Sequence, residues 1–157
     1  MTNIAVFVDV QNIYYTSRQA YGRQFNYRKL WDKISTQGDI VSAFAYAIER
    51  NDDKQKSFQS ALKNIGFEIK LKPYIQRSDG TSKGDWDVGI TIDILEQAAK
   101  VDVVILLSGD GDFDLLLRKV KQKYAIRTEV YGVPKLTANS LINAASCFHP
   151  IDDSLLL

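Results

Sequence analysis

The sequence is poor in the residues that build disulfides and soft-metal sites. Its 157 residues include one cysteine, Cys147, and one histidine, His149. A single cysteine excludes an intrachain disulfide and a zinc site built from cysteines. A single histidine, near the far end of the chain, leaves nucleophilic triads unsupported, and imidazole prefers softer metals than Mg²⁺. We expect His149 to be a surface or capping residue.

Neither the net charge nor the length of the apolar runs points to a particular partner. The formal net charge is +1, which predicts neither a nucleic-acid nor a membrane partner. No apolar run approaches the length of a membrane span, and the opening MTNIAVFVDV lacks the basic and long apolar regions of a signal peptide. The glycine-rich motifs of nucleotide-binding folds do not occur. We therefore expect a cytoplasmic protein in which any charged function depends on local segregation of sign.

Strand-like and helix-like segments alternate along the chain. Short runs rich in β-branched residues predict strands, and apolar residues at helical spacing predict helices between them. Strands are expected over 4–10, 39–48, 67–75, 101–108, 126–133 and 148–152, and helices over 26–34, 52–66, 86–100, 112–124 and 137–146. With no internal repeat or linker, residues 1–157 are expected to form one domain. The alternation predicts an α/β fold, a three-layer α/β/α sandwich around a central, mostly parallel sheet.

Acidic residues follow the two most apolar of these strands. Asp9 ends the first, and Asp110, Asp112 and Asp114 stand at alternate positions after the fourth, in VVILLSGDGDFDLLLRKV. Two such apolar strands belong at the centre of the sheet, and ligands bind beyond the carboxyl ends of parallel strands. We therefore expect Asp9 and Asp110 to share one crevice. Clustered carboxylates repel each other, and a divalent cation with hard oxygen ligands would offset that repulsion.

Ordinary structural roles compete with the metal site for some of these acids. Capping and compensation of the helix dipole explain Asp114 as well as a site does, and Asp9 has capping of the next segment as its alternative. A polar loop over 76–85 leads into a helix with Asp87 and Asp93. At about 100° per residue these two lie about 600° apart around the helix, so only one points into a single site. Lys83 in the loop is either a phosphate ligand or a solvated lysine.

Three motifs resemble those of NYN domains, in the LabA-like branch of the PIN-like nucleases. FVDVQNI is similar to their D-x-x-N opening, KGDWDVGITIDILE to their lysine–glycine loop and acid-headed helix, and LLSGDGDFDLLL to their S-G-D-x-D-F segment. The similarity covers nearly the whole chain, in the same order. It implies a PIN-like α/β sandwich, an acidic metal site and RNA as the substrate.

The resemblance also implies roles for individual residues. Four aspartates would hold the metal and, with Asn12, form the catalytic set: Asp9, Asp87, Asp110 and Asp112. Asn12 would orient Asp9 or a water on the metal. Four further residues are expected to support the site: Ser108, Lys83, Asp93 and Asp114. The GDWD segment has two residues between the glycine and the acid, where family members often have one, so Asp85 is the alternative to Asp87; the spacing to Asp93 favours Asp87.

These motifs predict a metal-dependent ribonuclease, an endonuclease that uses Mg²⁺ or Mn²⁺ to hydrolyse RNA phosphodiesters. Basic and aromatic residues after the first and third strands are expected to bind RNA: Tyr14, Arg18, Lys72, Arg77 and Lys83. The alternatives are a non-catalytic RNA-binding or regulatory NYN module and a small-molecule phosphohydrolase with the same metal chemistry. The sequence predicts no membrane partner, and a homo-oligomer is neither indicated nor excluded.

Overall fold

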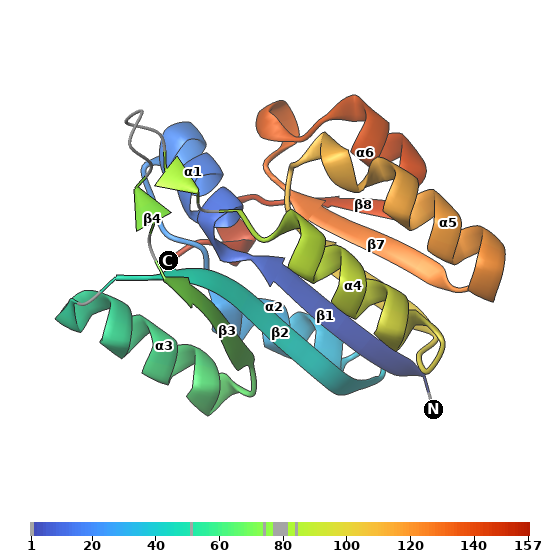
Figure 1. Ribbon diagram of the computed structural model, residues 1–157, viewed down its shortest axis with the longest axis horizontal. Helices are drawn as coiled ribbons and strands as arrows, with labels where there is room; N and C mark the ends of the chain where they lie inside the picture. The colour runs from blue at the N-terminus through green and yellow to red at the C-terminus, as the bar shows by residue number, and fades with distance from the viewer. Residues whose placement is uncertain (1, 51, 74, 77–81, 84) are drawn as a thin grey trace.

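A parallel sheet forms the centre of the molecule (Figure 1). The computed structural model describes residues 2–50, 52–73, 75–76, 82–83 and 85–157. Six strands pair in the order β3-β2-β1-β6-β7-β8, and every pairing in this sheet is parallel. They are β1 (Asn3–Asp9), β2 (Asp39–Glu49), β3 (Glu68–Pro73), β6 (Val103–Leu107), β7 (Arg127–Gly132) and β8 (Cys147–Pro150). Two short strands, β4 (Ile75–Gln76) and β5 (Ser82–Lys83), form a separate antiparallel pair.

Helices cover both faces of the sheet, which confirms the predicted three-layer α/β fold (Figure 1). One face is covered by α1 (Val10–Tyr21), α2 (Tyr27–Ser35) and α3 (Asp53–Ile65). The other is covered by α4 (Asp87–Ala98), α5 (Asp114–Tyr124) and α6 (Asn139–Ala144). Single 3₁₀ turns occur at η1 (Gly111–Phe113), η2 (Pro134–Leu136) and η3 (Asp153–Leu155). None of the helices in the described ranges is long and apolar enough to cross a membrane.

Burial explains why two strands read as continuous apolar runs. Residues 4–8 of β1 and all of β6 are buried, because helices pack on both sides of these central strands. By contrast β3 is half-buried and lies at the edge of the sheet, as its alternating sequence predicted. The predicted edge strand near the end of the chain is also present, as β8.

Two segments differ from the sequence predictions. The first strand ends at Asp9, and Val10 begins α1, a helix that the sequence analysis did not identify. Only Val10, Ile13 and Ser17 of this helix are buried, and the neighbouring Tyr14 and Tyr15 are exposed to solvent. The buried face of the helix is therefore narrow. The chain leaves α1 at Gly22, whose φ of 63° suits the left-handed end of a helix. The polar segment over 76–85, predicted as a loop, contains strand β5 in its described part.

Candidate metal centre

The ends of the central strands bring acidic residues from distant parts of the sequence together. Strands β1 and β6 are neighbours with Val8 opposite Leu107, so the residues that follow them leave the same edge of the sheet. Asp9 ends β1, and Asp110 comes shortly after β6. The prediction that both acids follow adjacent central strands is therefore confirmed.

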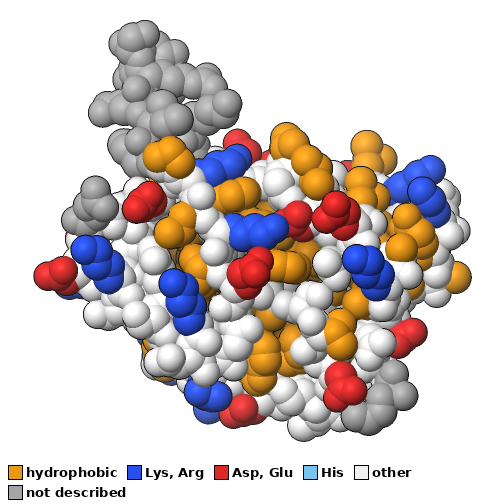
Figure 2. All heavy atoms as spheres, turned by 60° about the horizontal axis from the view of Figure 1, so that its bottom comes forward, with side chains coloured by type: hydrophobic (Ala, Val, Ile, Leu, Met, Phe, Trp, Pro, Cys, Tyr) orange, Lys and Arg blue, Asp and Glu red, His pale blue; other side chains and the backbone are white. Residues whose placement is uncertain are grey.

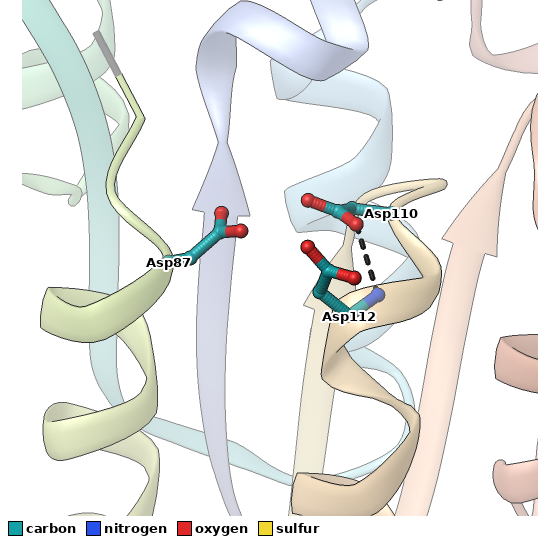
Figure 3. A group of neighbouring side chains, drawn as sticks. All are labelled: Asp87, Asp110 and Asp112. Atoms are coloured by element: carbon teal, nitrogen blue, oxygen red, sulfur yellow. Dashed lines mark hydrogen bonds between the residues drawn. The ribbon is translucent and has the colours of Figure 1, made fainter. Parts of the chain in front are cut away.

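Three carboxylates face one another at this edge (Figure 3). Asp87 extends from the first turn of α4, Asp110 from the loop after β6, and Asp112 from η1. One oxygen of each lies within 4.8 Å of the others. Asp110 Oδ1 also accepts the backbone N–H of Asp112 at 2.9 Å, which fixes the turn that carries both. The arrangement places three carboxyl groups around one position.

A buried hydroxyl ties Asp9 to this group. Ser108 is fully buried, and its Oγ donates to Asp9 Oδ2 at 3.0 Å while it accepts the backbone N–H of Asp110 at 3.1 Å. From α1, Asn12 Oδ1 accepts the backbone N–H of Gly109 at 2.9 Å. Asp9 is thus not one of the three converging carboxylates, and its role as a metal ligand stays a prediction. In this structure Ser108 and Asn12 hold the loop that carries Asp110.

Gly109 allows the chain to pass close to the loop after β7. A Cβ at this position would lie 2.4 Å from the carbonyl oxygen of Leu136, so a side chain does not fit without a backbone shift. The Gly109 carbonyl in turn accepts the N–H of Ala138 at 3.0 Å. The glycine of the S-G-D motif is therefore required by packing, independently of any ligand.

Burial and like charges disfavour ionisation of two of the acids. Burial, followed by the charge and hydrogen bonding of Asp110 and by the charges of Asp85 and Asp9, raises the pKa of Asp87 to about 7. Burial also raises the pKa of Asp9 to about 6, although the hydrogen bond from Ser108 opposes that shift. A bound cation would therefore favour the ionised forms of both carboxyl groups.

The ligand atoms fit a hard divalent cation. All three converging groups are carboxylates, and one of them, Asp112, is exposed to solvent. Mg²⁺ and Mn²⁺ prefer oxygen ligands, keep several waters and bind through few carboxylates. The donor set therefore agrees with the metal predicted from the sequence.

The single histidine lies elsewhere and has a structural role. His149 Nε2 lies 2.6 Å from Oε1 of the buried Glu129, and its ring stacks on Tyr131 at a centroid distance of 4.4 Å. The expectation of a surface or capping residue was wrong, because pairing of β8 with β7 half-buries this side chain.

The structure separates the acids that the sequence left as alternatives. Asp85 Oδ1 accepts the backbone N–H of Asp87 at 3.2 Å, so Asp85 supports the turn and Asp87 joins the cluster. Asp93 accepts hydrogen bonds from Tyr46 Oη at 2.7 Å and from Lys70 Nζ at 2.6 Å. Asp114 accepts the N–H of Leu115 in the first turn of α5. Asp93 and Asp114 therefore both have structural partners of their own.

Among the predicted RNA-binding residues whose side chains the structure describes, Lys72 lies on β3, whereas Tyr14 and Arg18 lie on α1. Lys72 Nζ donates to the carbonyl of Asp85 at 3.2 Å and lies 4.5 Å from the centroid of the Trp86 ring, next to the site. Arg18 pairs with Tyr14 on α1. Arg77 lies outside the described residues, and of Lys83 only the backbone, in β5, is described. Figure 2 shows basic and acidic side chains intermingled on one described face of the molecule.

Sequence reasoning missed the part played by Trp86. Its indole N–H donates to the carbonyl of Ala47 in β2 at 2.9 Å, which anchors the residue before Asp87 to the sheet. A tryptophan before a helix carries no sequence signal for such a contact, because the partner is a backbone atom distant in the chain.

A parallel sheet between two helical layers, with acids gathered at its carboxyl edge, is the arrangement expected of a PIN-like nuclease domain. Residues 3–152 match the NYN domain family, and the chain belongs to that family. The resemblance stated from the three motifs is thereby confirmed.

Two relatives show how far the similarity extends. The chain is 26% identical over 160 residues to the low amplitude and bright protein LabA of Synechococcus elongatus, covering 97% of this chain and 85% of that protein. It is 54% identical to a protein of unknown function from Vibrio parahaemolyticus with a crystal structure. The two structures have a TM-score of 0.95 over 99% of this chain and 96% of the other.

Proposed function

We propose that this protein is a metal-dependent endoribonuclease. The observation that carries the proposal is the convergence of Asp87, Asp110 and Asp112, with oxygens within 4.8 Å of one another at the carboxyl edge of the sheet. Three ionised carboxylates this close are unfavourable without a cation. Membership of the NYN family supports nuclease chemistry at such a cluster. RNA as the partner, Mg²⁺ or Mn²⁺ as the cofactor and a cytoplasmic location follow as predictions.

The proposed ligands are these three aspartates together with Asp9. A bound Mg²⁺ or Mn²⁺ would supply the positive charge that favours attack of water on a phosphodiester. Ser108 and Asn12 position the loop that carries Asp110, through the hydrogen bonds to Asp9 and Gly109. These contacts fix the ligand carboxylates before substrate binds, which lowers the cost of assembling the site.

Substrate contacts are proposed for residues on the rim. Lys72 lies next to Asp85 and Trp86, so its ammonium group is placed to contact a phosphate bound near the acidic cluster. Arg77 and Lys83 belong to the segment that precedes Asp87 in the sequence. Backbone phosphates would supply most of the affinity through such cations.

The test is cleavage of assorted RNAs with Mg²⁺, with Mn²⁺ and with a chelator. Asp110→Asn should reduce metal-dependent cleavage by at least about a hundredfold, because loss of charge stabilisation from a metal costs several kcal/mol in the transition state. The matched control is Asp32→Asn, which removes an exposed aspartate on α2 and should cleave like the wild type.

Other results would assign another function. RNA binding without metal-dependent cleavage of any RNA would favour the regulatory module. Turnover of a small phosphate ester without RNA binding would favour the phosphohydrolase. Cleavage that survives Asp110→Asn would place the chemistry outside this cluster.

A further inference from the structure

A groove of about 740 Å³ opens between α1, the end of β2 and the start of α3. Two of its lining residues adjoin the acidic site. Val10 follows Asp9 directly, and the carbonyl of Ala47 holds the indole of Trp86, which precedes Asp87. The groove and the carboxylates therefore share one edge of the sheet. Its volume is in the range of sites for small molecules or single units of a polymer.

Exposed aromatic rings form one wall of this groove. Tyr14 and Tyr15 are 44% and 50% exposed, and their rings meet edge to face with centroids 5.4 Å apart. Beneath them lie the buried side chains of Ile13 and Tyr27. Two neighbouring tyrosines left in solvent over an apolar floor offer ring faces on which a flat partner can stack.

Cations accompany the rings. Arg18 Nη1 lies 3.2 Å from Tyr14 Oη, with its guanidinium carbon 5.5 Å from the centroid of that ring. Arg50 Nη2 lies 3.5 Å from Tyr15 Oη, across the groove from α1. Lys54 adds a third cation to the lining. Two acids, Asp52 and Asp53, also line the groove, and Asp52 is engaged as the cap of α3, where its carboxylate accepts the N–H of Gln55 at 2.7 Å.

Ring faces alternating with guanidinium groups suit a polymer of flat bases joined by phosphates. Aromatic side chains stack on unpaired bases whatever the sequence, and arginine contacts the backbone phosphates. Bases within a duplex are covered by their neighbours and cannot stack on protein side chains. The chemistry of the groove therefore selects a single strand.

We propose that this groove seats unpaired nucleotides of an RNA strand, adjacent to the phosphodiester held at the carboxylates. This inference rests on the proposed ribonuclease function and adds a binding subsite outside the carboxylate cluster, formed by α1, the end of β2 and the start of α3. The groove adds affinity through stacking on its tyrosines and through its arginines, and cleavage depends on the acidic cluster. The two activities are therefore separable by substitution.

The experiment measures binding of a labelled single-stranded RNA by fluorescence anisotropy in chelator, where cleavage is suppressed. Tyr14→Ala with Tyr15→Ala should weaken binding by about tenfold or more, because each base–aromatic stack contributes about 1–3 kcal/mol. Tyr14→Phe with Tyr15→Phe keeps both rings and should bind like the wild type. Arg50→Ala should weaken binding and reduce its salt dependence, whereas Arg118→Ala, an exposed arginine on α5, should do neither.

The outcomes separate the groove from the catalytic proposal. Wild-type binding by the double alanine variant, with cleavage still lost in Asp110→Asn, overturns the groove and leaves the ribonuclease standing. Groove-dependent RNA binding without metal-dependent cleavage keeps the groove and overturns the ribonuclease. Equal affinity for a matched duplex, or for a mononucleotide, overturns the assignment of a single strand. Melting curves of every variant, the arginine and aspartate variants included, check that each of them folds.

Discussion

The hydroxyl of Ser108 links Asp9 to Asp110: it donates to the carboxylate of the first at 3.0 Å and accepts the backbone N–H of the second at 3.1 Å. Ser108→Ala removes both contacts from a fully buried position. We expect a loss of about 1.5–3 kcal/mol in the free energy of unfolding, the range for hydrogen bonds to charged groups. The pKa of Asp9 should also rise further, because the Ser108 bond lowers it. Urea unfolding measures the first effect.

Ser17 provides the matched control for that substitution. It is also fully buried, but its hydroxyl makes no hydrogen bond within the part of the chain that the structure describes. Ser17→Ala should be neutral or slightly stabilising, because it removes a buried polar group without a partner. Equal losses from the two substitutions would contradict the role assigned to Ser108.

Asp110→Asn tests whether the aspartates repel each other. Asparagine can still accept the N–H of Asp112, so the turn at η1 is kept while one negative charge is lost. The metal-free variant should be as stable as the wild type or more so, as is common at functional sites. Millimolar Mg²⁺ or Mn²⁺ should raise the melting temperature of the wild type and not that of the variant. Strong destabilisation, with a wild type that metals do not stabilise, would make the cluster structural.

The layers of the fold, and the edge of the sheet shared by Asp9 and Asp110, could be predicted because buried strands have recognisably apolar sequences. Strands β1 and β6 are covered on both faces, so both read as unbroken apolar runs, and the acids that end them are conspicuous. Placing the two most apolar strands at the centre was enough to bring Asp9 and Asp110 together.

Features that depend on distant partners were not predictable in the same way. Helix α1 was missed because exposed Tyr14 and Tyr15 obscure its narrow buried stripe. The motif predicted Asp93 to be a supporting residue of the site. In the structure its partners are Tyr46 of β2 and Lys70 of β3. No local pattern encodes such a contact, since tertiary packing alone brings the three together.

The raised pKa values predict how stability depends on pH. Asp87 and Asp9 bind protons more tightly when folded, with pKa values of about 7 and about 6 against an ordinary 3.8. Their contribution to the stability of the metal-free protein is therefore fully present below about pH 4 and is lost as pH rises through about 6 to 7. Melting temperatures in chelator should fall over that interval, and by less in Asp87→Asn. Saturating Mg²⁺ favours the ionised forms and should reduce the fall; identical profiles for all three samples would contradict the argument.

Asp93 and Asp112 allow the structural and functional roles of an aspartate to be separated by one type of substitution. Asp93→Asn keeps an acceptor for Tyr46 but removes the charge that Lys70 approaches to 2.6 Å, in a partly buried pair. We expect it to cost about 1–2 kcal/mol of unfolding free energy and to leave the metal-induced rise in melting temperature intact. Asp112→Asn, at an exposed member of the acidic cluster, should do the opposite: little or no loss of stability, and a smaller metal-induced rise. Combining Asp93→Asn with Lys70→Met in a double-mutant cycle measures the pair directly, and a coupling energy near zero would show that this ion pair does not stabilise the fold.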